Sequence, residues 1–180
     1  MGSLNSWRTI AGVTFGVAAL GVAAWLGSAT APRPGLRAAA PEFSLTDANG
    51  AAVRLADYRG RVVMLNFWAI WCAGCKLELP WLSEFQQRYE SQGLVSIALS
   101  LDDDGWAAIR PYLAEHPVAF PVVAADWDVA KRYAVSGLPL TLLVDRQGRI
   151  AASHLGLIDR DAWEAEIQRV LGEAEGPGER

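Results

Sequence analysis

Two cysteines three positions apart follow a continuous apolar run in this chain. The run 62–69 has the composition of a buried strand, and 76–89 carries apolar residues at helical spacing. Cys72 and Cys75 therefore lie where a strand turns into a helix. Residues three apart in a helical turn have Cα atoms about 5 Å apart, within the range of a disulfide bond. Because such a pair can open and close with little movement, the sequence predicts a redox-active disulfide.

The position of Cys72 favours its thiolate form. At the first turn of a helix, unpaired N–H groups and the positive end of the helix dipole stabilise a negative charge. Cysteines in such positions have pKa values between roughly 3.5 and 7.5, below the ordinary value of about 8.5, and the thiolate is the attacking species. We therefore predict that Cys72 is the nucleophile and that Cys75, one turn inside the helix, is the resolving thiol.

A structural disulfide and half of a zinc site are the two alternatives for this pair. A disulfide that closes so short a loop removes little chain entropy and stabilises the fold little. A zinc site needs further ligands, and the chain has no other cysteine and only two histidines, His116 and His154. His154 is far in sequence from the cysteines and is expected to be a surface or structural residue. Redox chemistry without a cofactor or a metal is the preferred interpretation.

An uncharged segment of 23 residues, 9–31, lies near the N-terminus. As a helix it is long enough to cross a hydrocarbon core about 30 Å thick. It is also longer than a typical signal h-region of about 7–15 residues, which favours a retained anchor over a cleaved signal. We expect a short tail over 1–8, a single transmembrane helix over 9–31 and a tether over 32–40, with the globular part outside the cytoplasm.

The pattern after the tether is that of one α/β domain over 41–172, followed by a flexible polar tail over 173–180. The chain from residue 41 onward has 13 basic and 20 acidic side chains, a net charge of −7, which argues against nucleic acid as a partner. Alternating strands and helices, then a hairpin and a last helix, indicate a mixed β-sheet with helices on both faces. Besides the elements around the cysteines, we expect strands over 94–101, 120–124, 140–144 and 149–154, and helices over 106–115, 127–133 and 161–171.

Four segments of the domain form a specific combination. They are Ala40-Pro41-Glu42-Phe43-Ser44-Leu45, the run 63–69, Cys72-x-x-Cys75-Lys76-x-Glu78-x-Pro80, and Ser136-Gly137-Leu138-Pro139. With them the chain resembles the extracytoplasmic thiol-disulfide oxidoreductases of the TlpA/ResA/CcmG group, which have the thioredoxin fold. The resemblance implies that Pro139 is a cis proline against the disulfide and that the backbone of Leu138 pairs with an extended substrate segment. Trp71, at the rim of the site, completes the predicted substrate-binding residues.

Glu78 follows Cys75 by three residues and so lies on the same face of the predicted helix. A carboxylate near a partly buried thiol can accept the thiol proton and return it. In the TlpA/ResA/CcmG group an acid at this spacing has that role, and we predict the same catalytic role for Glu78. The alternative is a solvated helix acid, or an ion-pair partner of Lys76 or Arg88.

The resemblance implies a membrane-tethered reductase of protein disulfides. Reduced Cys72 would attack a disulfide in a client such as an apocytochrome, Cys75 would resolve the mixed disulfide, and a membrane thiol donor of the CcdA/DsbD type would supply the electrons. Gly74 stands where the group often has proline, so the reduction potential does not follow from the resemblance.

Two other functions remain as alternatives. A thiol oxidase or a peroxiredoxin-like peroxide reductase is the alternative within redox chemistry, since 41–45 also resembles peroxiredoxins. Peroxiredoxins, however, have Thr or Ser at the position that Ala69 occupies here. A copper-binding carrier of the Sco type, on the same fold, is the alternative from another class, although that group has a wider cysteine spacing.

Overall fold

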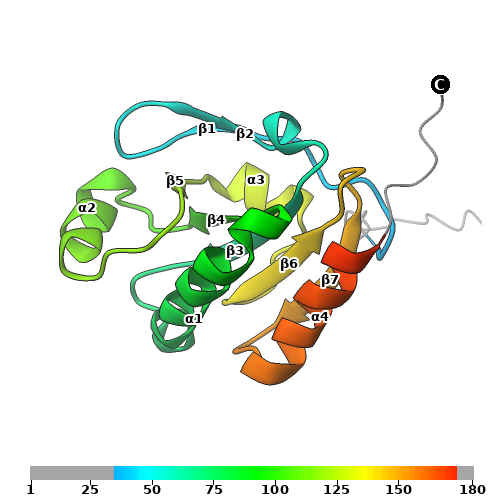
Figure 1. Ribbon diagram of the computed structural model, residues 1–180. Helices are drawn as coiled ribbons and strands as arrows, with labels where there is room; N and C mark the ends of the chain where they lie inside the picture. Colours follow the sequence, from blue (N-terminus) through cyan, green and yellow to red (C-terminus); the bar gives the residue numbers. More distant parts are fainter. Residues whose placement is uncertain (1–34, 174–180) are drawn as a thin grey trace, which may run out of the picture.

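Five strands form the central sheet in the order β5-β4-β3-β6-β7 (Figure 1). This computed structural model describes residues 35–173. β3 (Val62–Trp68) lies in the middle, parallel to β4 (Leu94–Ser100) and antiparallel to β6 (Leu140–Val144). β5 (Val122–Ala124) pairs in parallel with β4, and β7 (Ile150–Leu155) pairs antiparallel with β6. The predicted mixed sheet is confirmed.

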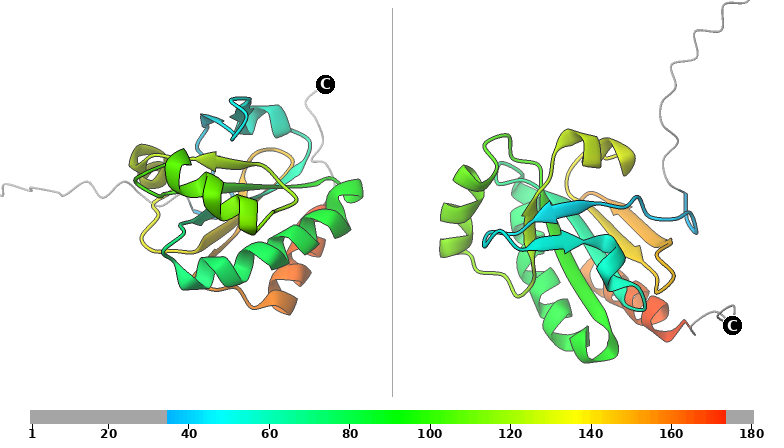
Figure 2. Two further views of the ribbon diagram at one scale, coloured as in Figure 1. Left: turned by 90° about the vertical axis from the view of Figure 1, so that its left-hand side faces the viewer. Right: turned by 90° about the horizontal axis from the view of Figure 1, so that it is seen from above.

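The two faces of the sheet are covered differently. α1 (Ala73–Tyr89) and α4 (Arg160–Gly172) lie side by side on one face, where Tyr89 donates a hydrogen bond to Glu164 (Figure 1, Figure 2). α2 (Trp106–Glu115) inserts Ile109 into the same apolar layer.

On the opposite face, α3 (Trp127–Arg132) packs next to a small antiparallel hairpin (Figure 2). The hairpin consists of β1 (Ser44–Thr46) and β2 (Ala52–Arg54) and leads into a 3-10 helix, η1 (Leu55–Tyr58). A second 3-10 helix, η2 (Glu90–Gln92), follows α1.

β3 is buried on both faces, which explains its continuous apolar sequence. Val62, Met64 and Trp68 pack among the side chains of α1, α2 and α4, whereas Val63, Leu65 and Phe67 pack among those of the hairpin and α3. Asn66 is the one polar residue in this strand, and it is buried. A buried amide needs hydrogen-bond partners, so Asn66 marks a position where the α1 face of the sheet is polar.

The expected elements agree with the structure within two residues at each end, with two exceptions. α1 begins at Ala73 instead of residue 76, because Cys72 caps it and the first turn has no apolar periodicity. The β1–β2 hairpin was not expected, since strands of three residues are too short to show an alternating pattern. The expected transmembrane helix over 9–31 lies outside the described residues. Within 35–173, every helix falls short of the length and hydropathy needed to cross a bilayer.

The chain before β1 runs along the outer edge of β7. Arg37 N–H donates to Ile150 O at 2.7 Å, Ile150 N–H donates to Ala38 O at 2.9 Å, and Ala40 N–H donates to Gly148 O at 2.9 Å. Ala40 is buried. These bonds attach the segment to the turn between β6 and β7. Since β6 is antiparallel to β3, this turn lies at the end of the sheet opposite the cysteines.

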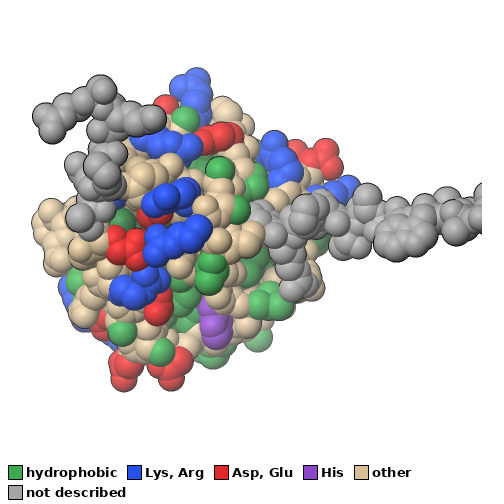
Figure 3. Space-filling model, turned by 90° about the vertical axis from the view of Figure 1, so that its right-hand side faces the viewer, with side chains coloured by type: hydrophobic (Ala, Val, Ile, Leu, Met, Phe, Trp, Pro, Cys, Tyr) green, Lys and Arg blue, Asp and Glu red, His purple; other side chains and the backbone are tan. Residues whose placement is uncertain are grey.

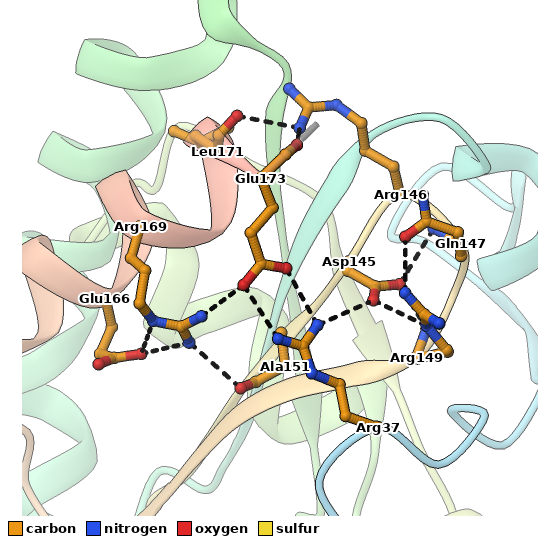
Figure 4. Close-up of polar contacts among 10 residues, drawn as sticks. All are labelled: Arg37, Asp145, Arg146, Gln147, Arg149, Ala151, Glu166, Arg169, Leu171 and Glu173. Carbon is orange, nitrogen blue, oxygen red and sulfur yellow. Dashed lines mark hydrogen bonds and ion pairs between the residues drawn. The ribbon is translucent and has the colours of Figure 1, made fainter. Parts of the chain in front are cut away.

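An ion-pair network holds this end of the molecule together (Figure 4). The Arg37 guanidinium lies between Asp145 and Glu173, at 3.7 Å from Asp145 Oδ2 and 3.0 Å from Glu173 Oε2. Asp145 is only 3% exposed and accepts the N–H groups of Gln147 and Arg149 at 3.0 and 2.9 Å. Its carboxylate therefore shapes the β6–β7 turn and joins the turn to the incoming chain.

We expect Asp145→Ala to lower the free energy of unfolding by about 2–4 kcal/mol, because two N–H groups of the turn lose their acceptor. The exposed Asp161, in the first turn of α4, provides the control: Asp161→Ala should change stability by less than about 1 kcal/mol. Urea unfolding of both variants measures the difference. Equal losses in the two variants would contradict the structural role of Asp145.

Candidate active site

The two cysteines form a disulfide at the N-terminus of α1. Their Cα atoms are 5.3 Å apart, as the three-residue spacing predicts. Cys72 has extended backbone angles and precedes the helix, and its Sγ accepts a hydrogen bond from Cys75 N–H at 3.2 Å. Cys72 is 8% exposed and Cys75 is wholly buried. Cys72 thus has a small exposed surface that Cys75 lacks, which favours the predicted order of attack.

The loop between β3 and α1 is held by the end of β4. Both carboxylate oxygens of Asp102 lie 3.1 Å from Ile70 N, and Asp102 Oδ2 accepts a hydrogen bond from Ser100 Oγ at 2.7 Å. Leu101 N–H donates to Trp68 O at 2.9 Å. Because these contacts fix the backbone that leads into the motif, Cys72 is presented from a supported loop.

Two of the predicted substrate-binding residues, Trp71 and Pro139, lie beside the start of α1. The peptide bond between Leu138 and Pro139 is cis, as the resemblance implies. A Cβ placed on Gly74 would lie 3.5 Å from Pro139 Cδ, so the proline contacts the first turn of α1. The Trp71 side chain is 68% exposed beside the cysteines, and Leu138 is partly buried. The pairing of the Leu138 backbone with a substrate stays a prediction.

Glu78 is wholly buried beneath the dithiol helix. Its Oε2 accepts hydrogen bonds from Asn66 Nδ2 at 2.8 Å and Thr141 Oγ1 at 3.0 Å, and its Oε1 accepts one from Ile158 N–H at 2.9 Å. Burial raises the pKa of Glu78 above its ordinary value by removing water from the charged form, while the three hydrogen bonds act in the opposite direction. The net effect favours the protonated form of Glu78 more than in an exposed carboxyl group.

The two alternatives for Glu78 do not describe its position. Complete burial rules out a solvated helix acid, and the guanidinium of Arg88 contacts Glu164 on α4 instead. Lys76 lies over the ring of Tyr112, with Nζ 5.6 Å from the ring centroid.

Strand register explains how the polar partners of Glu78 come together. Asn66 on β3 lies opposite Thr141 on β6, and Thr141 lies opposite His154 on β7. Directly opposite residues point to the same face of a sheet, so these three form a polar row on the face that α1 and α4 cover. Sequence reasoning missed Asn66, Thr141 and Ile158. A lone amide in an apolar buried strand was a signal for Asn66, whereas Thr141 and Ile158 carried none.

Within 35–173, no group of three or more His, Cys, Asp or Glu side chains is arranged to hold a metal ion. The α1 N-terminus instead combines a slightly exposed Cys72, a wholly buried Cys75 and, one turn further along the helix, a wholly buried Glu78. Thiol-disulfide exchange uses a nucleophilic thiol and a resolving thiol, and a carboxyl group can serve it as a proton acceptor.

Comparisons with known proteins agree with this chemistry. Residues 36–153 match the AhpC/TSA family. The chain is 33% identical over 132 residues to the thiol-disulfide oxidoreductase ResA of Geobacillus kaustophilus, which covers 73% of this chain and 75% of that protein. It is 37% identical over 112 residues to ResA of Bacillus subtilis, covering 62% of each.

Solved structures show the same relationship. A thiol:disulfide interchange protein of the DsbE type from Chlorobium tepidum superposes with a TM-score of 0.73 at 33% identity, covering 77% of this chain and 99% of that one. The chain therefore belongs to the AhpC/TSA family and is a thiol-disulfide oxidoreductase with the thioredoxin fold, similar to ResA.

Proposed function

We propose that this protein is a membrane-tethered, extracytoplasmic reductase of disulfides in client proteins. The observation that carries the proposal is the buried Glu78, one helical turn beyond Cys75. In a reductase the resolving thiol must lose its proton in every cycle, and Cys75 has no exposed surface through which water could take that proton. A neighbouring buried carboxylate with a raised pKa provides the acceptor.

The reaction begins with the reduced protein. The Cys72 thiolate attacks one sulfur of the client disulfide, forms a mixed disulfide and releases the other client sulfur as a thiolate. Glu78 takes the proton of the Cys75 thiol, and the Cys75 sulfur then attacks Cys72 Sγ. The second client sulfur leaves as a thiolate, and the Cys72–Cys75 disulfide forms. Two electrons have passed from the dithiol to the client, and Glu78 returns its proton when the disulfide is next reduced.

The setting outside the cytoplasm rests on the uncharged segment 9–31 and on the TlpA/ResA/CcmG resemblance. A membrane thiol donor of the CcdA/DsbD type would re-reduce the disulfide, and apocytochromes would be among the clients, as the TlpA/ResA/CcmG resemblance implies. The chain enters the domain beside the β6–β7 turn, at the far end of the sheet from Cys72. A tethered domain would thus present its cysteines away from the attachment point.

The reduction potential of the Cys72–Cys75 pair tests the direction of electron flow. We expect the full chain, equilibrated in detergent with glutathione or dithiothreitol buffers, to give a value at or below about −220 mV, as for a reductase with a dedicated donor. A value near about −120 mV would make the protein an oxidant of exported thiols instead. Turnover of hydrogen peroxide without a protein client would favour the peroxide reductase.

A further inference from the structure

One peptide group connects the buried carboxyl group to the edge of the sheet. The N–H of Ile158 donates to Glu78 Oε1 at 2.9 Å. The carbonyl oxygen of the same peptide group, which belongs to Leu157, lies 3.1 Å from His154 Nε2. Because a carbonyl oxygen can only accept, Nε2 is the donor. A chain of two hydrogen bonds therefore runs from the imidazole through the Leu157–Ile158 peptide group to the carboxylate.

His154 occupies the outer end of the polar row. It lies opposite Thr141, which donates to the other oxygen of Glu78. β7 is an edge strand, and the imidazole is only half-buried, with its ring centroid 6.2 Å from that of Trp163. His154, which is far from the cysteines in sequence, thus connects to Glu78 indirectly, through the Leu157–Ile158 peptide group.

We propose that His154 is a positioning residue for the redox site: it holds the Leu157 carbonyl so that the Ile158 N–H is aimed at Glu78. The inference rests on the proposed function, since the position of Glu78 matters to exchange only if its carboxyl group takes part. Hydrogen bonds in a chain strengthen one another, because donation to the carbonyl polarises the N–H on the same peptide group. Donation from this N–H to a carboxylate is charge-assisted and favours the ionised form.

Among the described residues, other charged side chains lie near His154 but do not contact this peptide group. Asp159, Glu166 and Arg169 line a hollow between β7 and α4 together with His154 (Figure 3). Arg169 pairs with Glu166, and Asp159 accepts the N–H of Ala162 at the start of α4. Among the charged or titratable residues that line this hollow, His154 is the one that contacts the Leu157–Ile158 peptide group, whose N–H is bonded to Glu78.

Three variants separate this role from a general effect on folding. His154→Phe and His154→Ala both remove the donor, so that the test survives if one of them fails to fold. His154→Gln retains a side-chain N–H that can reach the Leu157 carbonyl. His116→Phe is the matched control, because His116 Nδ1 also contacts a backbone carbonyl, that of Tyr112, at 3.1 Å, but at the end of α2.

The titration of the Glu78 carboxyl group, followed by carbon NMR in the full chain in detergent, is the primary measurement. We expect its midpoint to move upward in His154→Phe and His154→Ala, because the ionised form loses part of its stabilisation. It should stay near the wild-type position in His154→Gln and His116→Phe. An unchanged midpoint in both donor-less variants, or an equal displacement in His154→Gln, would overturn the positioning role.

The pH profile of client disulfide reduction separates this inference from the proposed function. If the Glu78 midpoint and the rate profile move together in His154→Phe, both stand. If the midpoint moves while the rate profile stays in place, His154 positions Glu78 as proposed, but Glu78 does not carry the proton of the exchange reaction.

Discussion

Replacing Cys75 with serine should stop the enzyme at a covalent mixed disulfide with its client. Cys72 keeps its slightly exposed position at the start of α1, so we expect it still to attack. The serine hydroxyl occupies the position of the resolving thiol but cannot displace a client sulfur, so the adduct accumulates. The variant, expressed in the full chain, should retain client proteins in bands that disappear on reduction in gel electrophoresis. Mass spectrometry then identifies the attached cysteine.

Cys72→Ser is the matched control for this experiment. Its remaining sulfur, that of Cys75, is wholly buried, so we expect no adduct and no disulfide reduction. If Cys72→Ser captured clients as well as Cys75→Ser does, the assignment of nucleophile and resolving thiol would be wrong.

Replacing Glu78 with glutamine should slow the resolution of the mixed disulfide by about 100-fold near neutral pH, because the acceptor of the Cys75 proton is lost. The first attack by Cys72 should change less. Stopped-flow measurement of the two steps distinguishes them. The exposed Glu84 lies on the same helix, and Glu84→Gln should leave both rates unchanged. Equal resolution rates in the two variants would contradict the role of Glu78.

The glutamine variant should fold, because its polar neighbours can adapt. Asn66 Oδ1 has no hydrogen-bond partner among the described residues. Rotation of the Asn66 amide would turn this oxygen toward the new glutamine amide. Ile158 N–H would keep an oxygen acceptor, and the Thr141 hydroxyl can accept as well as donate.

The stability of the oxidised protein should also depend on Glu78 in a defined direction. Burial raises the pKa of this carboxyl group above its unfolded value, so the native state binds more protons than the unfolded state between the two pKa values. The free energy of unfolding contributed by Glu78 is therefore fully present below the unfolded pKa and is lost as the pH rises through the native pKa. Urea unfolding from acidic to neutral pH should show this decrease in the wild type and a flatter profile in Glu78→Gln.

Local sequence was sufficient for the fold class and the redox pair. The geometry of Cys72 and Cys75 depends only on their three-residue spacing within one helical turn. β3 and β4 can be recognised in the sequence as nearly continuous apolar runs. The identification of Pro139 came from the family resemblance, because a proline in a loop has no local signature of a cis bond. The β1–β2 hairpin was not predicted, because strands of three residues are too short to show an alternation of apolar and polar residues.

Within the described residues, the sequence by itself determined the order of the strands and α-helices from β3 onward, the strand-to-helix junction and the cysteine pair. Each of these depends on residues within a few positions of one another. The tertiary structure alone decided what surrounds Glu78. Thr141 is 63 residues and Ile158 is 80 residues away from it along the chain. Strand register and the packing of α1 on the sheet bring these groups together. Register and packing are set when the apolar side chains on both faces of the sheet are buried. The same register places His154 opposite Thr141, on the strand next to the partners of Glu78.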